Sequence, residues 1–255
     1  MSTETTTRNQ GATGAGAVVL QDITKSFNNS PVLTGISLTI QPGETVAIMG
    51  PSGSGKSTLL HCMSGVLVPD AGKVFLGDTN ISYLSDAKRS ALRLNKFGFV
   101  FQDGQLLPEL TARENVALPA ILRGEPRGAA LKAADDMLTR LGLGDLLGRR
   151  PGKMSGGQAQ RVAIARAIAT KPQVIFADEP TGALDQQTGH EVMQQLIAVV
   201  EQSGSTLIMV THDAKVANWC QRRVEIRDGI IHDDRMLAGA GAHSVLNNRS
   251  VERVN

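Results

Sequence analysis

Short unbroken runs of apolar residues recur along the chain, and each run is followed by a glycine or a polar residue. The runs lie at 45–49, 97–101, 174–177 and 206–210. Strands buried on both faces show such continuous runs, whereas strands with one solvated face alternate apolar and polar residues. The pattern therefore predicts a parallel sheet in an α/β protein, in which ligands bind beyond the carboxyl ends of the strands.

Helical patterns occupy the segments between these runs. Helices are predicted at 57–64 and from Ser155 to about 169. Between Gln102 and Ser155 the strand signals stop, and two helices are predicted, one from about Thr111 and one over 128–141. Thr111 and Glu114 make the residue pair of a capping box at the start of the first of these two. We expect 103–155 to be a helical subdomain.

Further strands are predicted near both ends of the chain. Segments 18–24, 32–40 and 72–76 are expected to form an antiparallel edge, and 224–227 with 230–233 a hairpin turned at Asp228-Gly229. Residues 1–16 are rich in Thr, Gly and Ala and predict a disordered tail, and 238–255 predict a second tail. The expected organisation is one domain over 17–237 that contains the helical subdomain.

The segment after the first apolar run carries a phosphate-binding pattern. It reads Gly50, Pro51, Ser52, Gly53, Ser54, Gly55, Lys56, Ser57 and Thr58. The glycines let consecutive backbone N–H groups point inward, and the following helix adds its positive N-terminal dipole. Lys56 is expected to reach the β and γ phosphates of a nucleoside triphosphate, and Ser57 to bind Mg²⁺. A flexible Gly/Ser turn is the plain alternative.

Two adjacent acids end the third apolar run. Asp178 is placed to hold Mg²⁺, and Glu179 to polarise or orient the attacking water. A helix-capping or turn role is the structural alternative for both acids.

Met154 to Gln158 reads Met-Ser-Gly-Gly-Gln at the start of a predicted helix, with Ser155 as N-cap. Together with the motifs above, it resembles the ATP-binding cassette (ABC) ATPases, whose signature is Leu-Ser-Gly-Gly-Gln. Met in the first place keeps an apolar side chain. The resemblance covers residues from about 18 to 237. It implies a P-loop NTPase (RecA-like) core with an antiparallel β edge and an inserted α-helical subdomain.

The resemblance also assigns roles to single residues. It implies that Ser155, Gly156, Gly157 and Gln158 complete the nucleotide site of a second copy. Gln102 matches a glutamine that binds Mg²⁺ and water, and His212 matches a switch histidine that contacts the γ phosphate. Residues 183–185 match a loop along the dimer seam. Phe27 falls where the family stacks an aromatic ring on adenine, and core packing is its alternative role. In isolation, a Gln or His after a strand is a turn residue.

The amino-acid sequences of 177–185, of 98–102 and of the segment after Gln102 resemble those of one branch of the family. This branch contains the macrolide-exporter, lipoprotein-release, haem-efflux and cell-division ATPases. The resemblance implies an ATP- and Mg²⁺-dependent homodimer at the cytoplasmic face of the cell membrane. It would drive two copies of a separate transmembrane permease, with haem, a macrolide, a peptide or a lipoprotein as cargo. The alternative is a cell-division-type regulatory ATPase that signals through a permease-like partner without moving solute.

Composition narrows the classes of function that this protein can have. The 255 residues carry a net charge of +2, which gives no sign of a nucleic-acid partner. No apolar run approaches the ~20 residues that span a bilayer, so no direct membrane insertion is expected. Cys62 and Cys220 are isolated and read as small apolar residues. The five histidines form no haem or metal pattern. A binding module without turnover is disfavoured by the presence of Glu179.

Overall fold

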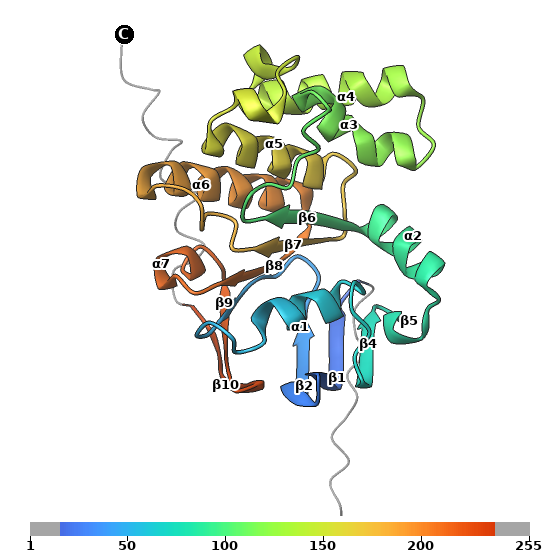
Figure 1. Cartoon of the computed structure of the whole chain (residues 1–255), viewed down its shortest axis with the longest axis vertical. Helices are drawn as coiled ribbons and strands as arrows, with labels where there is room; N and C mark the ends of the chain where they lie inside the picture. Colours follow the sequence, from blue (N-terminus) through green and yellow to red (C-terminus); the bar gives the residue numbers. More distant parts are fainter. Residues whose placement is uncertain (1–15, 238–255) are drawn as a thin grey trace, which may run out of the picture.

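A six-stranded sheet forms the centre of the protein, whose computed structural model describes residues 16–237 (Figure 1). Its order is β10-β9-β3-β8-β7-β6, and all neighbours are parallel except the antiparallel pair β9 and β10. The strands are β3 (Thr45–Met49), β6 (Phe97–Phe101), β7 (Val174–Asp178), β8 (Thr206–Thr211), β9 (Arg222–Arg227) and β10 (Ile230–Met236). The predicted parallel sheet is therefore confirmed, and the terminal hairpin extends it.

Each buried strand sends alternate side chains to two separate cores. Val46 and Ile48 of β3 pack in the cluster that contains α1 (Lys56–Met63), whereas Ala47 packs in the cluster on the other side. The second cluster contains apolar side chains of α5 (Gly156–Ile168) and α6 (Gln186–Ser203), near α7 (Ala214–Ala217). Consequently α1 covers one face of the sheet, and α5 and α6 cover the other (Figure 1).

A second, antiparallel sheet packs beside α1 and confirms the expected β edge. Its order is β2-β1-β4-β5, made of β1 (Val18–Phe27), β2 (Ser30–Ile40), β4 (Ala71–Leu76) and β5 (Thr79–Asn80). The two sheets are joined where the Thr34 N–H donates to the Gly229 carbonyl at 2.9 Å. Strand β1 runs past the predicted end at Thr24 to Phe27, because it pairs with β2 along its whole length.

The block between Gln102 and Ser155 is helical, as predicted. It contains α3 (Ala112–Leu122) and α4 (Arg127–Arg140), followed by the 3₁₀ turns η2 (Gly144–Leu146) and η3 (Pro151–Lys153). The capping box at the start of α3 is present. Side chains of α3, α4 and α5 share a third core. Because α5 belongs to two cores, the boundaries of a subdomain at 103–155 within 17–237 stay a prediction.

Three helices were not anticipated from the sequence, namely α2 (Asp86–Lys96), which follows the 3₁₀ turn η1 (Ile81–Tyr83), α6 and the short α7. The two expected tails lie outside the described residues, apart from Gly16. Within 16–237, the structure contains no helix that combines the length and the apolar character needed to span a bilayer.

Candidate functional site

The phosphate loop connects β3 to α1 at the carboxyl edge of the sheet, where the arrowheads of β6 and β7 also point (Figure 1). Its backbone leaves no room for side chains at two glycines. A Cβ on Gly50 would lie 2.0 Å from the Ile226 carbonyl oxygen, and one on Gly55 would lie 2.8 Å from the Val32 carbonyl oxygen. Gly55 has a φ of 93° and caps α1 without a side-chain hydrogen bond. The first N–H groups of α1 therefore stay available to an anion.

The polar side chains of this loop are only partly satisfied within the chain. Lys56 is 8% exposed, and its Nζ donates to the Pro51 carbonyl at 2.8 Å. The Ser54 hydroxyl is buried and has no hydrogen-bond partner among the described residues. A buried polar atom of this kind needs a partner from outside the chain. The loop therefore has the donors that a bound phosphate chain requires.

Asp178 and Ser57 link the loop to β7. The Ser57 hydroxyl donates to Asp178 Oδ1 at 3.2 Å. Burial raises the pKa of Asp178, and the Ser57 hydrogen bond opposes that rise. A hydroxyl and a carboxylate so placed are oxygen ligands of the type that Mg²⁺ accepts. Both side chains therefore fit the magnesium role predicted for them.

Glu179 lies at the turn that follows β7, in a conformation that only a minority of residues adopt. Its φ is 47°, and its N–H is held by the Val210 carbonyl at 2.9 Å. Its carboxylate lies 2.7 Å from His212 Nδ1 and accepts from the His212 N–H at 3.1 Å and the Thr211 hydroxyl at 3.2 Å. The predicted water-orienting acid and switch histidine are thus in direct contact.

Gln102 begins the loop after β6 and reaches the same region. A Cβ on Gly182 would lie only 2.9 Å from Gln102 Nε2. The glutamine amide therefore packs against the turn that follows Glu179. Phe27 ends β1, and its side chain is 45% exposed with the Lys25 ammonium 5.7 Å from its ring centroid. That exposure excludes the core-packing alternative for Phe27.

The signature segment is packed on α6. Ser155 and Gln158 form a capping box, since the Ser155 N–H donates to Gln158 Oε1 at 3.0 Å and the Gln158 N–H donates back to the hydroxyl at 3.2 Å. A Cβ on Gly157 would lie 2.3 Å from Thr188 Cγ2, and one on Gly156 would lie 3.2 Å from Leu184. The segment and the loop at 183–185 therefore form one packed unit. Gln158 has a structural task in this unit, besides the nucleotide contact predicted for it.

The structure does not bring the signature segment to the phosphate loop of the same chain. α5, which follows the signature, packs on the face of the sheet opposite to α1, which follows the phosphate loop. The two anion-binding features are therefore separated by the sheet itself (Figure 1).

Two side chains of α5 that sequence reasoning missed hold the ends of the Gln102 loop. Gln160 is buried, and its amide donates to the carbonyls of Phe101 at 2.8 Å and Pro180 at 2.7 Å. Arg166 donates to the carbonyls of Gln105 at 2.7 Å and Gly104 at 2.8 Å. Burial lowers the pKa of Arg166. Both partners are carbonyls far away in the sequence, so no local signal reveals them.

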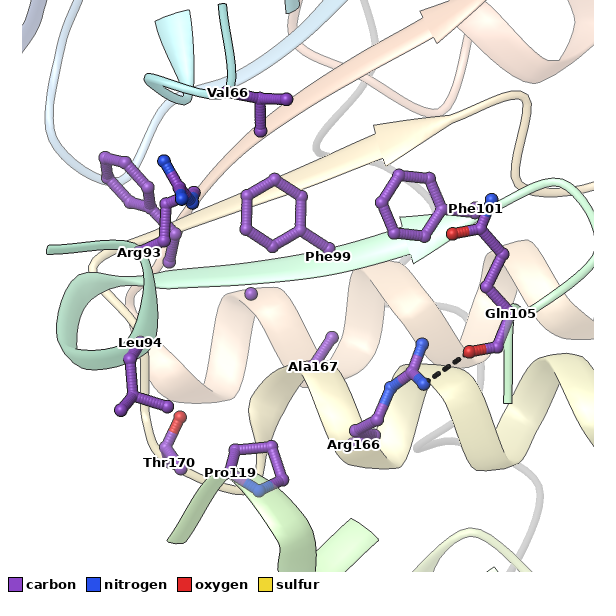
Figure 2. A pocket seen from close by; sticks show the side chains of 12 residues that line it. Val66, Arg93, Leu94, Phe99, Phe101, Gln105, Pro119, Arg166, Ala167 and Thr170 are labelled. Carbon is purple, nitrogen blue, oxygen red and sulfur yellow. Dashed lines mark hydrogen bonds between the residues drawn. The ribbon is translucent and has the colours of Figure 1, made fainter. Parts of the chain in front are cut away.

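A cavity of about 440 Å³ lies beside this loop (Figure 2). It is framed by β6, α2, α3 and α5, and its lining includes Arg93, Phe99, Phe101, Gln105, Pro119 and Arg166. Of the neighbouring leucines, Leu106 packs into the third core and Leu107 is 43% exposed. The cavity thus opens next to a partly apolar surface.

Comparison with known proteins decides the family. The family described as "ABC transporter" matches residues 33–182. This chain belongs to the ABC transporter family. It is an ATP-binding, ATPase domain of that family, and the predicted resemblance and fold class are confirmed.

Named relatives of this ABC ATPase fall into two groups. It is 48% identical over 221 residues to the macrolide export ATP-binding/permease protein MacB of Marinobacter nauticus, and it spans 34% of that protein with 85% of its own length. It is 45% identical over 209 residues to the lipoprotein-releasing system ATP-binding protein LolD of Aquifex aeolicus, and this match covers 82% of the chain and 93% of LolD.

A solved structure shows the same architecture. The ATP-binding cassette MJ0796, a dimer in a post-hydrolysis state with ADP and Pi, superposes with a TM-score of 0.80 and 40% identity. The match covers 87% of this chain and 99% of that one.

Proposed function

We propose that this chain is the ATP-hydrolysing motor of a bacterial exporter, closing on ATP as a homodimer and driving a separate permease. One observation carries the proposal. The phosphate loop and the signature segment, both anion-binding features, lie on opposite faces of one sheet. A single copy therefore offers two half-sites, and two copies related by a two-fold axis offer two complete ones.

The roles of the site residues follow from their contacts. Lys56 exchanges its bond to the Pro51 carbonyl for the β and γ phosphates, and Ser54 donates its buried hydroxyl to a phosphate oxygen. Ser57 and Asp178, with Gln102, hold Mg²⁺. When bound there, the metal neutralises charge on the phosphates. Phe27 offers its exposed ring to the adenine.

Catalysis is assigned to the Glu179 and His212 pair. Glu179 is held by the Thr211 hydroxyl and the His212 N–H, so its carboxylate is oriented before ATP arrives. It positions the attacking water and accepts its proton, while His212 turns to contact the γ phosphate. From the second copy, Ser155, Gly156, Gly157 and Gln158 close over the same phosphate.

The names of the relatives support export or release as the task of the complex. MacB is named for macrolide export and carries "permease" in its name, and LolD is named for lipoprotein release. We infer a peripheral position at the cytoplasmic face of the membrane, with two permease copies docking near the cavity of Figure 2. These names favour transport over the regulatory alternative. The permease, rather than this chain, would select the cargo among haem, a macrolide, a peptide and a lipoprotein.

Mixing two inactive variants tests the composite site. Lys56→Ala removes the phosphate-binding ammonium, and Ser155→Arg blocks the signature segment. In a heterodimer, one site carries both defects and the other is intact. We expect each variant alone to lack ATPase activity and the mixture to regain part of it. A mixture as inactive as its components, or a fully active Ser155→Arg chain, would remove the composite site from the mechanism.

A further inference from the structure

A second cavity lies behind the start of the phosphate loop. Its volume is about 460 Å³, and it is lined by Met49, Gly50, Pro51, His212, Arg223, Glu225 and Arg227. The loop and the switch histidine belong to the nucleotide site described above. Arg223, Glu225 and Arg227 of β9 lie outside the nucleotide site.

The direction of the β9 side chains follows from the sheet register. Arg223 pairs with Ala47 and Glu225 with Met49 across the parallel ladder of β3 and β9. Val224 and Ile226 pack in the core on the α1 face. Because successive side chains alternate, Arg223, Glu225 and Arg227 project on the opposite face, where they line the cavity.

Arg223 differs from the other arginines of β9. Arg222 bonds to both Glu44 and Asp234, and Arg227 is paired with Glu225. Arg223 Nε is buried without a hydrogen-bond partner, and among residues 16–237 its guanidinium has no acid opposite it. The cavity therefore holds one uncompensated cation.

Arg223 is half-buried, and its buried Nε has no partner, so its guanidinium is free to bind an anion from outside the chain. Unsatisfied buried donors are rare in proteins and commonly mark a bound ion or water. The planar guanidinium has several N–H donors and binds phosphate oxygens in pairs. Because Arg227 pairs with Glu225 and neutralises it, the cavity presents the positive charge of Arg223 to a ligand.

The position of the cavity indicates which anion Arg223 binds. His212 lines it and also contacts Glu179, the residue placed to activate the attacking water. Gly50 and Pro51, which open the phosphate loop, form another part of its wall. We propose that Arg223 binds inorganic phosphate, receiving the hydrolysis product as it leaves the nucleotide site past His212. This inference rests on the proposed function and assigns a product site to it.

Phosphate binding can be measured apart from hydrolysis. The probe is inorganic phosphate alone, followed by ³¹P NMR line broadening on the full chain. A Lys56→Ala background removes most binding at the phosphate loop, so that the remaining binding reports on the cavity. We expect Lys56→Ala/Arg223→Met to bind at least about tenfold more weakly than Lys56→Ala. Arg140→Met in the last turn of α4, an exposed arginine outside the cavity, serves as the matched control and should change nothing.

Turnover supplies the second readout. In the otherwise native chain, Arg223→Met should weaken inhibition of ATPase activity by added phosphate, while affinity for a fluorescent ATP analogue stays unchanged. Equal phosphate binding with and without Arg223 overturns the site. The same holds if Arg223→Met abolishes ATP-dependent dimerisation but leaves phosphate binding intact, since Arg223 would then serve a carboxylate of the second copy. If the native chain does not hydrolyse ATP at all, the proposed function itself fails, whatever the titration shows.

Discussion

Glu179 shows how a single residue can be held in readiness by its backbone. A positive φ is unfavourable for a residue with a side chain, by on the order of 1–3 kcal/mol, and is kept only where the surroundings impose it. Here the Val210 carbonyl fixes the Glu179 N–H, and Thr211 and His212 fix its carboxylate. The strained turn therefore holds the carboxylate against His212.

Glu179→Gln tests this residue. The amide oxygen still accepts from the His212 N–H, and the amide NH₂ group donates to the Thr211 hydroxyl. The side chain no longer takes a proton from water, so we expect ATP affinity to persist and hydrolysis to fall at least about 100-fold. The variant should accumulate as an ATP-bound dimer in size-exclusion chromatography. Glu201→Gln makes the same chemical change on an exposed position of α6 and should keep normal turnover. If Glu179→Gln hydrolysed ATP within a few-fold of the parent rate, another group would have to position the attacking water.

Residues that act through local geometry could be predicted from the sequence, and residues that act at long range could not. The phosphate loop, the paired acids and the Ser155 cap depend on neighbours within a few positions. Gln160 and Arg223 depend on partners, or on the lack of one, that only the folded chain defines. The nucleotide half-sites therefore stay a prediction from the sequence, and no local pattern in it indicates the side chains that support them.

At the scale of elements, the start of α5 depends on a close approach to α6. Gly157→Ala would place a methyl carbon 2.3 Å from Thr188 Cγ2. We expect this overpacking to cost about 1–3 kcal/mol in the free energy of unfolding, measured by chemical denaturation. Thr188→Ser removes the obstructing methyl group and should restore most of the loss in the double variant. Gly128→Ala, which has open space around its Cβ, should not destabilise the chain. A Gly157→Ala chain of native stability would show that α5 and α6 can separate freely.

Arg166 joins the signature helix to the Gln102 loop. Arg166→Met removes its bonds to the carbonyls of Gly104 and Gln105, and these carbonyls lose a charged donor. We expect faster amide hydrogen exchange over 102–106 and a several-fold lower kcat with little change in KM, because Gln102 is less well placed. Arg166→Lys should recover part of the rate. Arg140→Met, an exposed change at the end of α4, is the control. If Arg166→Met changed neither amide exchange nor kcat, the contact of Arg166 with the loop would have no effect on the position of Gln102.

The elements themselves were predicted to different degrees, for physical reasons. Buried strands such as β7 and β8 show unbroken apolar runs, and α3 has a capping box. α2 has no buried residue, but its few apolar side chains gather on one side of the helix at helical spacing, so its sequence does predict a helix, which apolar runs alone do not reveal. α6 carries a helical repeat in Val192, Leu196 and Val200 that does predict a helix, but it was overlooked beside the stronger motifs. The pairing of β9 with β3 is a long-range contact that no local pattern specifies.

At the scale of the whole molecule, the nucleotide half-sites and the cavity of Figure 2 meet in the Gln102 loop. The loop leaves β6 beside the acids, is held by α5, and leads to the leucines before α3. A partner that presses on the cavity therefore acts on Gln102 and on the signature helix together. We propose this loop as the route that couples the motor to its permease.

Leu107→Glu tests that surface. Leu106 packs into the third core, whereas Leu107 is 43% exposed, so a charge at 107 should leave the fold and nucleotide binding intact. A permease helix that covers an apolar side chain gains about 25 cal/mol for each Å² removed from water, and a glutamate there forfeits that gain. We expect Leu107→Glu to hydrolyse ATP as the isolated chain while losing permease co-purification and transport. Met236→Glu changes an apolar residue on β10 that is also exposed but distant in the fold, and it should retain both. A misfolded Leu107→Glu chain would assign this leucine to the seam between the core and the helices, and normal transport would place the docking site elsewhere on the subunit.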